Sequence, residues 1–332
     1  MINKLHQMPD NAPTTSTAIM PRTHRCRTVR YTFTALVTIL ATSLLYRPSA
    51  SAQLRPSGMG FSVDYSPGSR YVRPEDSVKT GSTSAMQRFN FEANFLLSNK
   101  MDTVTHRYRA WAMTVRGSYS KLTNKDFEKR VLPSELLNAD IGVQHLRSLR
   151  NNWSLLAVAS VGLYTDLSEI NSNDLFINAG AFFIKQKGKF TYGFGAVATN
   201  VVGVPLLLPG VLFQYHTQGK WQVDVVLPEN VSLTYKASKQ SDLTLYFRPK
   251  QVPYDVDTKL HDKRLLSYWE LPIGLEHTWR IGKKVEVRYS GGLMALRSFQ
   301  YTDKSLSQLF SNAPVHRLTA NYFLNAGIRW NF

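Results

Sequence analysis

Residues 318–332 read LTANYFLNAGIRWNF, and the chain ends on the aromatic ring of Phe332. Every even-numbered position from Leu318 to Phe332 is apolar or aromatic, whereas all odd-numbered positions except Phe323 are polar, charged or glycine. Successive side chains of a β-strand point to opposite faces, so this pattern predicts one long strand with an apolar face and a polar face. The last residues of a soluble domain usually fray in water, whereas this segment is expected to stay ordered to its end.

The same alternation recurs in three earlier segments. Their apolar stripes are formed by Phe89, Phe91, Ala93, Phe95 and Leu97; by Trp269, Leu271, Ile273, Leu275 and Trp279; and by Val285, Val287, Tyr289, Gly291, Leu293 and Ala295. The opposite stripes carry charged side chains, which include Arg88, Glu92, Glu270, Glu276, Arg280, Glu286 and Arg288. Each strand is therefore expected to lie with one face against apolar material and the other against polar groups.

Fourteen candidate strands follow residue 52. They begin near Met59, Met86, Val104, Leu136, Trp153, Leu175, Phe190, Gly210, Lys220, Val231, Asp242, Leu266, Lys284 and His316. Short turns, such as those around Gly188 and Gly282, alternate with long polar connections, such as residues 66–85, 249–265 and 299–315. An even strand number with alternating long outer loops and short periplasmic turns is typical of transmembrane β-barrels.

The sequence therefore predicts an all-β fold, an antiparallel transmembrane β-barrel of about fourteen strands. Twelve strands are an alternative, because the strands between Gly210 and Arg248 are shorter than the roughly 9 to 11 residues that a tilted span requires. A soluble β-sandwich is a second alternative. The tryptophans favour the barrel, because Trp153, Trp221, Trp279 and Trp330 fall at one rim, where aromatic residues of membrane proteins gather at the bilayer interface.

Residues 1–52 have the three parts of a secretory signal peptide. Basic residues from Arg22 to Arg30 precede an apolar run from Tyr31 to Leu45, and Ala50-Ser51-Ala52 forms a small-residue cleavage site. We expect cleavage after Ala52, which leaves residues 53–332 as the barrel, with Met20 as an alternative start of translation. A membrane anchor is the competing interpretation, but the apolar run is shorter than the roughly 20 residues that span a bilayer.

The remaining chain is basic and contains no cysteine. Residues 53–332 carry 34 Lys and Arg against 22 Asp and Glu, and Cys26, the single cysteine, lies in the leader. The exported protein therefore contains no disulfide bond and no thiolate metal site. Its positive charge favours anionic solutes, outer-membrane lipid or lipopolysaccharide as partners, whereas nucleic acid is not expected for an exported protein.

The end of the chain resembles the C-terminal β-signal of bacterial outer-membrane proteins. In residues 325–332, the polar Asn325, Gly327 two positions later, and the aromatic Trp330 and Phe332 match the elements of that signal. The resemblance implies insertion by the barrel-assembly machinery into the outer membrane of a Gram-negative bacterium. Physically, a barrel in lipid must close its last strand on its first, since unpaired backbone groups there cost several kcal/mol each.

More broadly, the chain from about Met59 to its end resembles an uncharacterised family of bacterial outer-membrane β-barrels with a domain of unknown function. The segment from Gly203 to Pro209, together with Trp221 and Leu227-Pro228, carries this resemblance. It implies a barrel fold, and it transfers no functional residues.

The charged stripes supply candidate residues for the barrel interior: Glu270, Glu276, Arg280, Glu286, Arg288, Arg317 and Arg329. A barrel of fourteen strands lies between those that side chains fill and those that leave an aqueous channel. The mixed charges favour a porin-like or substrate-specific diffusion channel for small polar solutes. The alternatives are ion pairing of Glu and Arg across a plugged lumen, and a structural or ligand-binding barrel that acts through its outer loops.

Enzymatic activity and cofactors are not expected. The sequence lacks the motifs of zinc proteases, serine hydrolases, phosphate-binding loops and calcium loops. His316 is the histidine nearest to strand-end serines, but its parity predicts that it points outward while Ser298 points inward, so the two should not meet.

Overall fold

The computed structural model describes residues 57–102, 104, 107–128, 131–200, 204, 206–216, 219–256, 264–307 and 313–332. The predicted signal peptide lies outside these residues. The strands are β1 (Gly58–Val72), β2 (Lys79–Asp102), β3 (Arg107–Lys125), β4 (Glu135–Ser148), β5 (Trp153–Thr165), β6 (Leu175–Lys187), β7 (Phe190–Thr199), β8 (Leu206–His216), β9 (Trp221–Leu227), β10 (Asn230–Lys236), β11 (Ser241–Phe247), β12 (Lys250–Asp255), β13 (Leu265–Ile281), β14 (Val285–Thr302), β15 (His316–Leu318) and β16 (Asn321–Asn331). A 3-10 turn, η1 (Ser172–Asp174), precedes β6. Within the described ranges, none of the helical segments has the length and apolarity that a membrane span requires.

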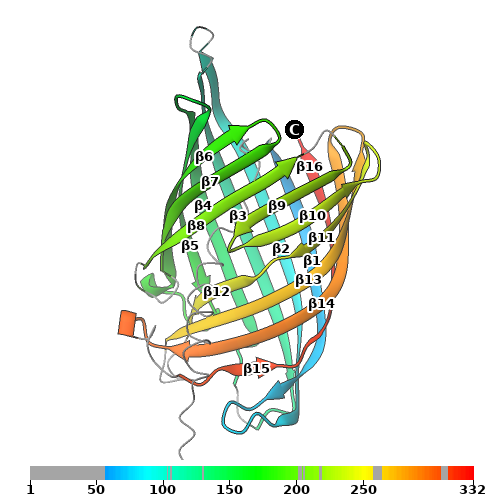
Figure 1. The fold of residues 1–332 in the computed structure, drawn as a ribbon. Coiled ribbons are helices and arrows are strands. Elements are labelled where there is room, and N and C mark those ends of the chain that lie inside the picture. Colours follow the sequence, from blue (N-terminus) through cyan, green and yellow to red (C-terminus); the bar gives the residue numbers. More distant parts are fainter. Residues whose placement is uncertain are drawn as a thin grey trace, which may run out of the picture.

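Fourteen of these strands close into a barrel, as the alternating pattern predicts (Figure 1). β1 to β11 follow one another around the wall, then β13, β14 and β16, and β16 pairs back onto β1 in antiparallel register from Gly58↔Asn331 to Tyr65↔Leu324. Two short strands continue others: β12 extends the course of β11 along β13, and β15 precedes β16 along β14. The prediction of fourteen strands is thus confirmed.

The two ends of the barrel differ in their connections. At the end that carries Phe332, at the top of Figure 1, the connections have two to four residues. At the opposite end they have six to thirteen, except for the two-residue turn at Pro228 between β9 and β10. Two connections are shorter than the sequence predicts: most of residues 66–85 belongs to β1 and β2, and residues 250–255 form β12.

The outer surface is apolar along the strands, as a lipid-facing surface must be. Phe61, Phe194, Leu275, Leu324 and Ile328 are all exposed on it, and they belong to stripes that alternate with buried or inward side chains. Four tryptophans lie near the Phe332 end, because Trp153 and Trp221 begin their strands while Trp279 and Trp330 lie at or near the ends of theirs. The arrangement agrees with an aromatic belt at one bilayer interface.

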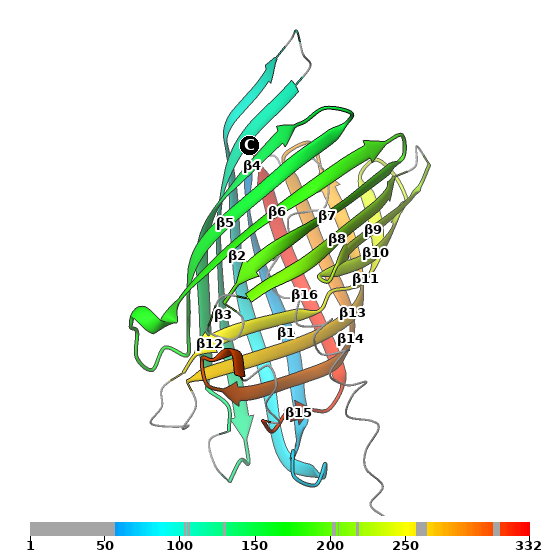
Figure 2. The same cartoon turned by 60° about the vertical axis from the view of Figure 1, so that its left-hand side comes forward.

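At the opposite end the wall is closed by fewer strands. β12 forms a parallel bridge to β5 at Asp255↔Thr165, so β1 to β5, β12, β13, β14 and β15 make a second closed ring of nine strands. A ring with an odd number of strands must contain one parallel pair, and this bridge supplies it. β9 and β10 have seven residues each and end above β12 (Figures 1 and 2). We call the fourteen-stranded end, with Phe332, the wide end and the nine-stranded end the narrow end.

Apolar side chains fill the narrow end. Every strand of the nine-stranded ring contributes to this cluster, which contains Tyr71, Met86, Leu122, Leu132, Leu136, Tyr254, Val256, Leu266, Tyr268, Phe299, Tyr301 and Leu318, with Tyr164 packed against it. Leu132, with Phe127 and Val131 beside the cluster, comes from the β3–β4 connection. A barrel of about eight strands is just wide enough for its own side chains to fill. The nine-stranded ring is close to that size, so we call this cluster the apolar fill.

Candidate functional site

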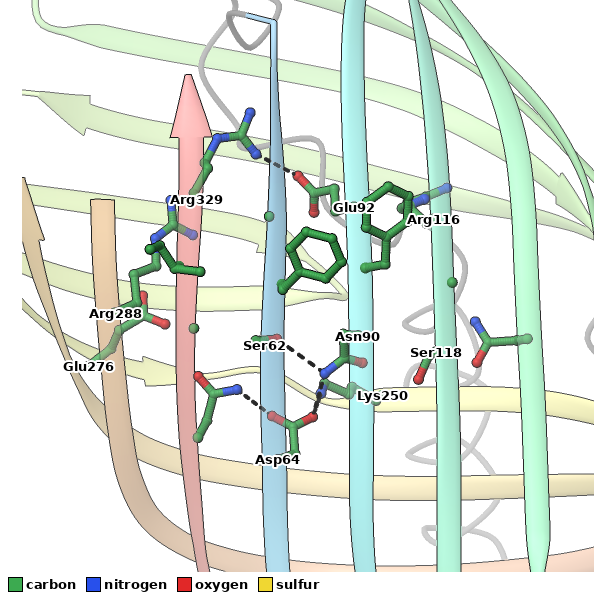
Figure 3. Close-up of a pocket in the computed structure, with 18 residues that line it drawn as sticks. Ser62, Asp64, Asn90, Glu92, Arg116, Ser118, Lys250, Glu276, Arg288 and Arg329 are labelled. Carbon is green, nitrogen blue, oxygen red and sulfur yellow. Dashed lines mark hydrogen bonds and ion pairs between the residues drawn. The ribbon is translucent and has the colours of Figure 1, made fainter. Parts of the chain in front are cut away.

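A polar cavity occupies the lumen on the wide side of the apolar fill. It encloses about 100 Å³ and is lined mainly by β1, β2, β3 and β16. Figure 3 shows Asp64, Asn90 and Glu92 pointing into it, with Arg288 and Arg329 at one side. A second cavity of about 40 Å³ shares Asp64 and Lys250 with the first and reaches toward the narrow end. A buried water needs about 10 to 15 Å³, so the larger cavity has room for several waters.

A buried ion pair crosses the lumen at the bottom of these cavities. Arg88 on β2 and Glu270 on β13 are 4% and 2% exposed, and their two nitrogen–oxygen distances are 2.8 and 2.7 Å. Three strands separate β2 from β13 around the wall, so the pair bridges the interior. Arg88 also donates from Nε to Ser120 Oγ at 2.8 Å, so all three nitrogens of its guanidinium group donate hydrogen bonds.

Arg297 on β14 makes a second crossing beside this pair. It is fully buried and donates to Tyr268 Oη at 2.8 and 3.0 Å and to the Ser84 carbonyl on β2 at 3.1 Å. Tyr268 lies two residues from Glu270 in the direction of the narrow end. The two arginines and their partners therefore form a polar partition between the cavity and the apolar fill.

Six of the seven predicted interior charges form ion pairs in the structure. Glu270 pairs with Arg88 in the partition, and Glu276 pairs with Arg248 at 3.0 Å. Arg280 pairs with Asp242, Arg288 with Glu286 at 2.8 Å, and Arg329 with Glu92 at 3.0 Å. Arg116 and Asp140 form another pair at 2.7 Å. The structure thus gives these charges partners of opposite sign, across the lumen for Glu270 and closer along the wall for the others, instead of gathering like charges at one constriction.

Arg317 differs from its prediction. It is exposed, while its neighbours His316 and Leu318 contribute to the interior: His316 stacks on the buried Phe299 at 4.9 Å and Leu318 belongs to the apolar fill. The strand is interrupted at residues 319–320, between β15 and β16, and this break reverses the alternation. A two-residue period holds only while the strand stays regular.

A bulge in β14 reverses the inward and outward directions of the side chains that follow it. Leu271 pairs with Leu296 but Pro272 pairs with Met294, so Ala295 is the extra residue. Ser298 consequently pairs with the exposed Arg317 on the outer face, contrary to its predicted inward direction. Both parity predictions, for His316 and for Ser298, are wrong, and the two side chains still lie on opposite faces.

The interior residues that sequence reasoning missed lie at or beyond such irregularities. Arg297 follows the bulge, so simple parity places it on the outside, and Lys250 falls in a segment predicted as a loop. Pro272 was the available signal, because a proline within a strand removes a ladder hydrogen bond and often marks a bulge. Lys250 Nζ lies 3.8 Å from Asp64, across the lumen from its own strand.

Three residues of the C-terminal signal lie on the closing strand β16, and Phe332 follows it directly. Asn325 donates to Asp64, and a β-carbon at Gly327 would lie 2.8 Å from Ser62, so β16 approaches β1 closely there. Trp330 and Phe332 are half-exposed on the outer face. The Phe332 backbone N–H donates to the Ser57 carbonyl at 3.0 Å, which shows that the strand is ordered to its last residue.

The connection between β5 and β6 is tied to the narrow end by Lys304. Its Nζ lies 2.5 Å from Asp255 and donates to the Asn173 carbonyl at 2.6 Å. Asp174 is fully buried in this connection, where its side chain accepts the Asn171 backbone N–H at 2.7 Å. Burial raises the pKa of the Asp174 carboxyl, and the nearby Asp255 carboxylate raises it further.

With this architecture in place, comparison with known proteins gives one family. The family described as "Domain of unknown function (DUF6268)" matches residues 48–331. The chain belongs to this family. The resemblance to an uncharacterised family of barrel proteins is therefore confirmed. No curated protein matches the chain.

Several solved β-barrels are similar at low sequence identity. The COG4313 outer membrane channel from Pseudomonas putida F1 is 10% identical over 86% of this chain and 99% of its own, with a TM-score of 0.43. The deltaS2 mutant of the TodX monoaromatic hydrocarbon channel is 8% identical over 83% and 90% of the two chains, with a TM-score of 0.42. A mutant of the Rh. blastica porin is 9% identical over 84% and 99%, with a TM-score of 0.33.

Proposed function

We propose that the protein is a substrate-specific diffusion channel for small polar solutes in the outer membrane of a Gram-negative bacterium, and that its closed state is the one described above. The observation that carries this proposal is the polar cavity, which is lined by charged side chains and bounded by a partition and an apolar fill. A barrel with a merely structural role has no need of a hydrated interior at its wide end. A general porin, in turn, leaves its whole lumen open to water.

The orientation follows from the connections and the leader. Short turns at the wide end are typical of the periplasmic side and longer loops of the cell surface. The predicted signal peptide supports export, and the C-terminal signal supports insertion by the barrel-assembly machinery. In this orientation the polar cavity faces the periplasm and the apolar fill faces outward, where the membrane surface carries lipopolysaccharide.

Opening requires movement of the apolar fill and of the polar partition beside it. Leu132 belongs to a connection rather than to a strand, and Tyr254 and Val256 lie at the end of β12, which meets β5 through a single bridge. These elements have less backbone pairing than the continuous wall and so are the parts that can move at least cost. The gate would therefore lie between Leu132 and the end of β12.

A ligand-binding or structural barrel that acts through its outer loops is the second candidate. The tie that Lys304 makes between two narrow-end connections favours this candidate, because it holds the loops together over a closed end. The two functions differ in whether solute crosses the membrane.

Solute flux tests the proposal. Residues 53–332 would be refolded, checked by heat-dependent gel mobility and reconstituted in liposomes, whose swelling in arabinose is then measured. We expect swelling above that of empty liposomes, a faster rate for the gate variant Tyr254→Ala, and no change for Tyr254→Phe, which keeps the ring. If neither the folded wild-type protein nor folded Tyr254→Ala conducts arabinose, the channel proposal is overturned. The ligand-binding or structural barrel would then be the remaining candidate.

A further inference from the structure

Three cationic side chains lie next to one another on the outer face of the barrel near its wide end. The strand registers place Lys100 of β2 directly opposite Arg109 of β3, and Arg109 directly opposite Arg147 of β4, and all three are exposed. The two arginines point away from the lumen, because the adjacent Ala110 and Leu146 are buried on the inner face. Strands β2 and β3 continue past the other turns of the wide end as a hairpin (Figure 2). We call Lys100, Arg109 and Arg147 the cationic row.

The signs of these charges distinguish the row from the rest of the wall. In the other described registers, wherever two charged residues of neighbouring strands stand directly opposite each other, their signs are opposite, as in Glu92↔Arg116 and Arg280↔Glu286. Like charges in this arrangement destabilise a sheet, because their β-carbons are only about 4.5 to 5.5 Å apart. Two like-charged pairs in succession therefore favour a compensating anion close by.

The chain itself offers the row no carboxylate partner. None of the ion pairs among the described residues includes a member of the cationic row. Asp102, the next acidic residue along β2, stands opposite Arg107 instead. The compensating anion is therefore expected to come from outside the chain.

The outer face beside the row is typical of the level of lipid head groups. Trp111 and His145 form the next outward-facing pair along β3 and β4, and their ring centroids lie 4.2 Å apart. Beyond them, Val143 and Ile141 are 43% and 48% exposed on the same face of β4. This face thus changes from apolar through aromatic to basic toward the wide end. Aromatic side chains gather at the bilayer interface, so the cationic row lies where lipid phosphates lie.

We propose that the cationic row binds the phosphate group of an anionic phospholipid in the leaflet at the wide end. Arg109 and Arg147 stand on neighbouring strands and would donate to oxygens of one phosphate, a group whose geometry suits the guanidinium fork. Lys100 adds a third positive charge at the edge of the site. The acyl chains lie along the exposed apolar side chains of β3 and β4. A zwitterionic lipid is disfavoured, because its ammonium group would meet three cations.

This lipid site requires only that the barrel lies in a bilayer, and the orientation proposed above assigns it to the periplasmic leaflet of the outer membrane. Because the row faces lipid rather than the lumen, Arg147→Gln should leave arabinose swelling of liposomes unchanged. Absence of flux would therefore reject the channel and leave the lipid site intact, and failure of the lipid site would leave the channel intact.

Lipid binding by the folded barrel tests the proposal. Wild-type residues 53–332 are compared with Arg147→Gln and with Arg150→Gln, which removes an exposed charge of the β4–β5 turn that lies outside the row. Each protein is refolded in a neutral detergent, checked by heat-dependent gel mobility, and titrated with dioleoylphosphatidylglycerol or dioleoylphosphatidylcholine. Native mass spectrometry measures the dissociation constant of the first bound lipid.

We expect the wild-type protein to bind phosphatidylglycerol more tightly than phosphatidylcholine. Arg147→Gln should weaken phosphatidylglycerol binding by roughly fivefold, the contribution of one Lys or Arg at an anionic lipid surface, and Arg150→Gln should leave it unchanged. Equal binding of the two lipids by the wild-type protein would overturn the proposal. No greater weakening by Arg147→Gln than by Arg150→Gln would overturn it as well, because the affinity would then reflect total charge.

The like-charged contact gives a second readout. In phosphatidylcholine vesicles, Arg147→Gln should unfold at a higher urea concentration than the wild-type protein, because the repulsion from Arg109 is removed. Addition of phosphatidylglycerol should then raise the midpoint of the wild-type protein more than that of the variant. An equal rise for both proteins, or a variant less stable than wild-type protein in phosphatidylcholine, would contradict a lipid phosphate as the compensating anion.

Discussion

The ion pair across the lumen gives the sharpest test of how dry the polar partition is. Glu270→Gln removes one charge and keeps the side-chain volume, so Arg88 stays buried at 4% exposure without its carboxylate. Removing one partner of a buried pair costs about 3 to 5 kcal/mol. Ser120 still accepts from Arg88, and Asp64 lies 3.9 Å away, so these contacts offset part of the loss. The expected loss in free energy of unfolding is therefore about 3 kcal/mol, at the lower end of that range.

The double variant Arg88→Met/Glu270→Leu separates two causes of instability: a buried charge left without its partner, and the loss of packing contacts. Replacing both partners of a buried pair with apolar side chains is neutral or stabilising by about 1 to 4 kcal/mol. Asp76→Asn is the matched surface control, because Arg73 and Asp76 form a pair at 2.7 Å with side chains 51% and 43% exposed. Exposed pairs contribute about 1 kcal/mol or less.

Reversible urea unfolding in lipid vesicles, followed by tryptophan fluorescence, measures all three variants. A loss below about 1 kcal/mol for Glu270→Gln would mean that water reaches Arg88 and that the partition is open. A double variant as unstable as Glu270→Gln would also refute the reasoning, because the cost would then come from packing rather than from an unpaired charge.

Three further predictions concern other parts of the barrel. Phe299→Ala should lower the free energy of unfolding by about 3 to 5 kcal/mol, because removal of this fully buried ring leaves a cavity in the apolar fill. Phe299→Leu should cost less, and urea unfolding compares the two variants. Deletion of Phe332 should reduce the amount of folded barrel recovered from cell membranes while leaving refolding in detergent unchanged, and equal losses in both would instead indicate a stability role. Because the pKa of Asp174 is raised in the folded state, protonation of this carboxyl favours folding, and the free energy of unfolding should rise as pH falls through that pKa. Asp174→Asn keeps an acceptor for the Asn171 backbone N–H, and the urea midpoint of this variant should lose this pH dependence.

The sequence predicts the wall well because alternation is a local property. The starts of β5, β6 and β7 at Trp153, Leu175 and Phe190 coincide with the predicted starts. Parity fails where the strand itself is irregular, at the break before β16 and at the bulge at Ala295, and these two sites account for the wrong directions of Arg317 and Ser298.

The closed narrow end was not predictable in the same way. It depends on one parallel bridge, Asp255↔Thr165, between segments that are far apart in the chain and carry no shared pattern. The choice of ion-pair partners is equally non-local, since Arg88 meets Glu270 across 182 residues. Alternation indicates that such charges point inward, but only the closed ring determines which of them meet.

Closure of the narrow end by the apolar fill is the central feature of the proposed channel. Single-channel recording in a planar bilayer tests it most directly, with folded wild-type protein and the variant Tyr254→Ala/Phe299→Ala, which removes two rings of the fill. Wild-type protein should stay closed except for brief openings, and the variant should give sustained steps that scale with salt concentration. Sustained steps from the wild-type protein as soon as it inserts, or a folded variant that stays silent, would contradict the account.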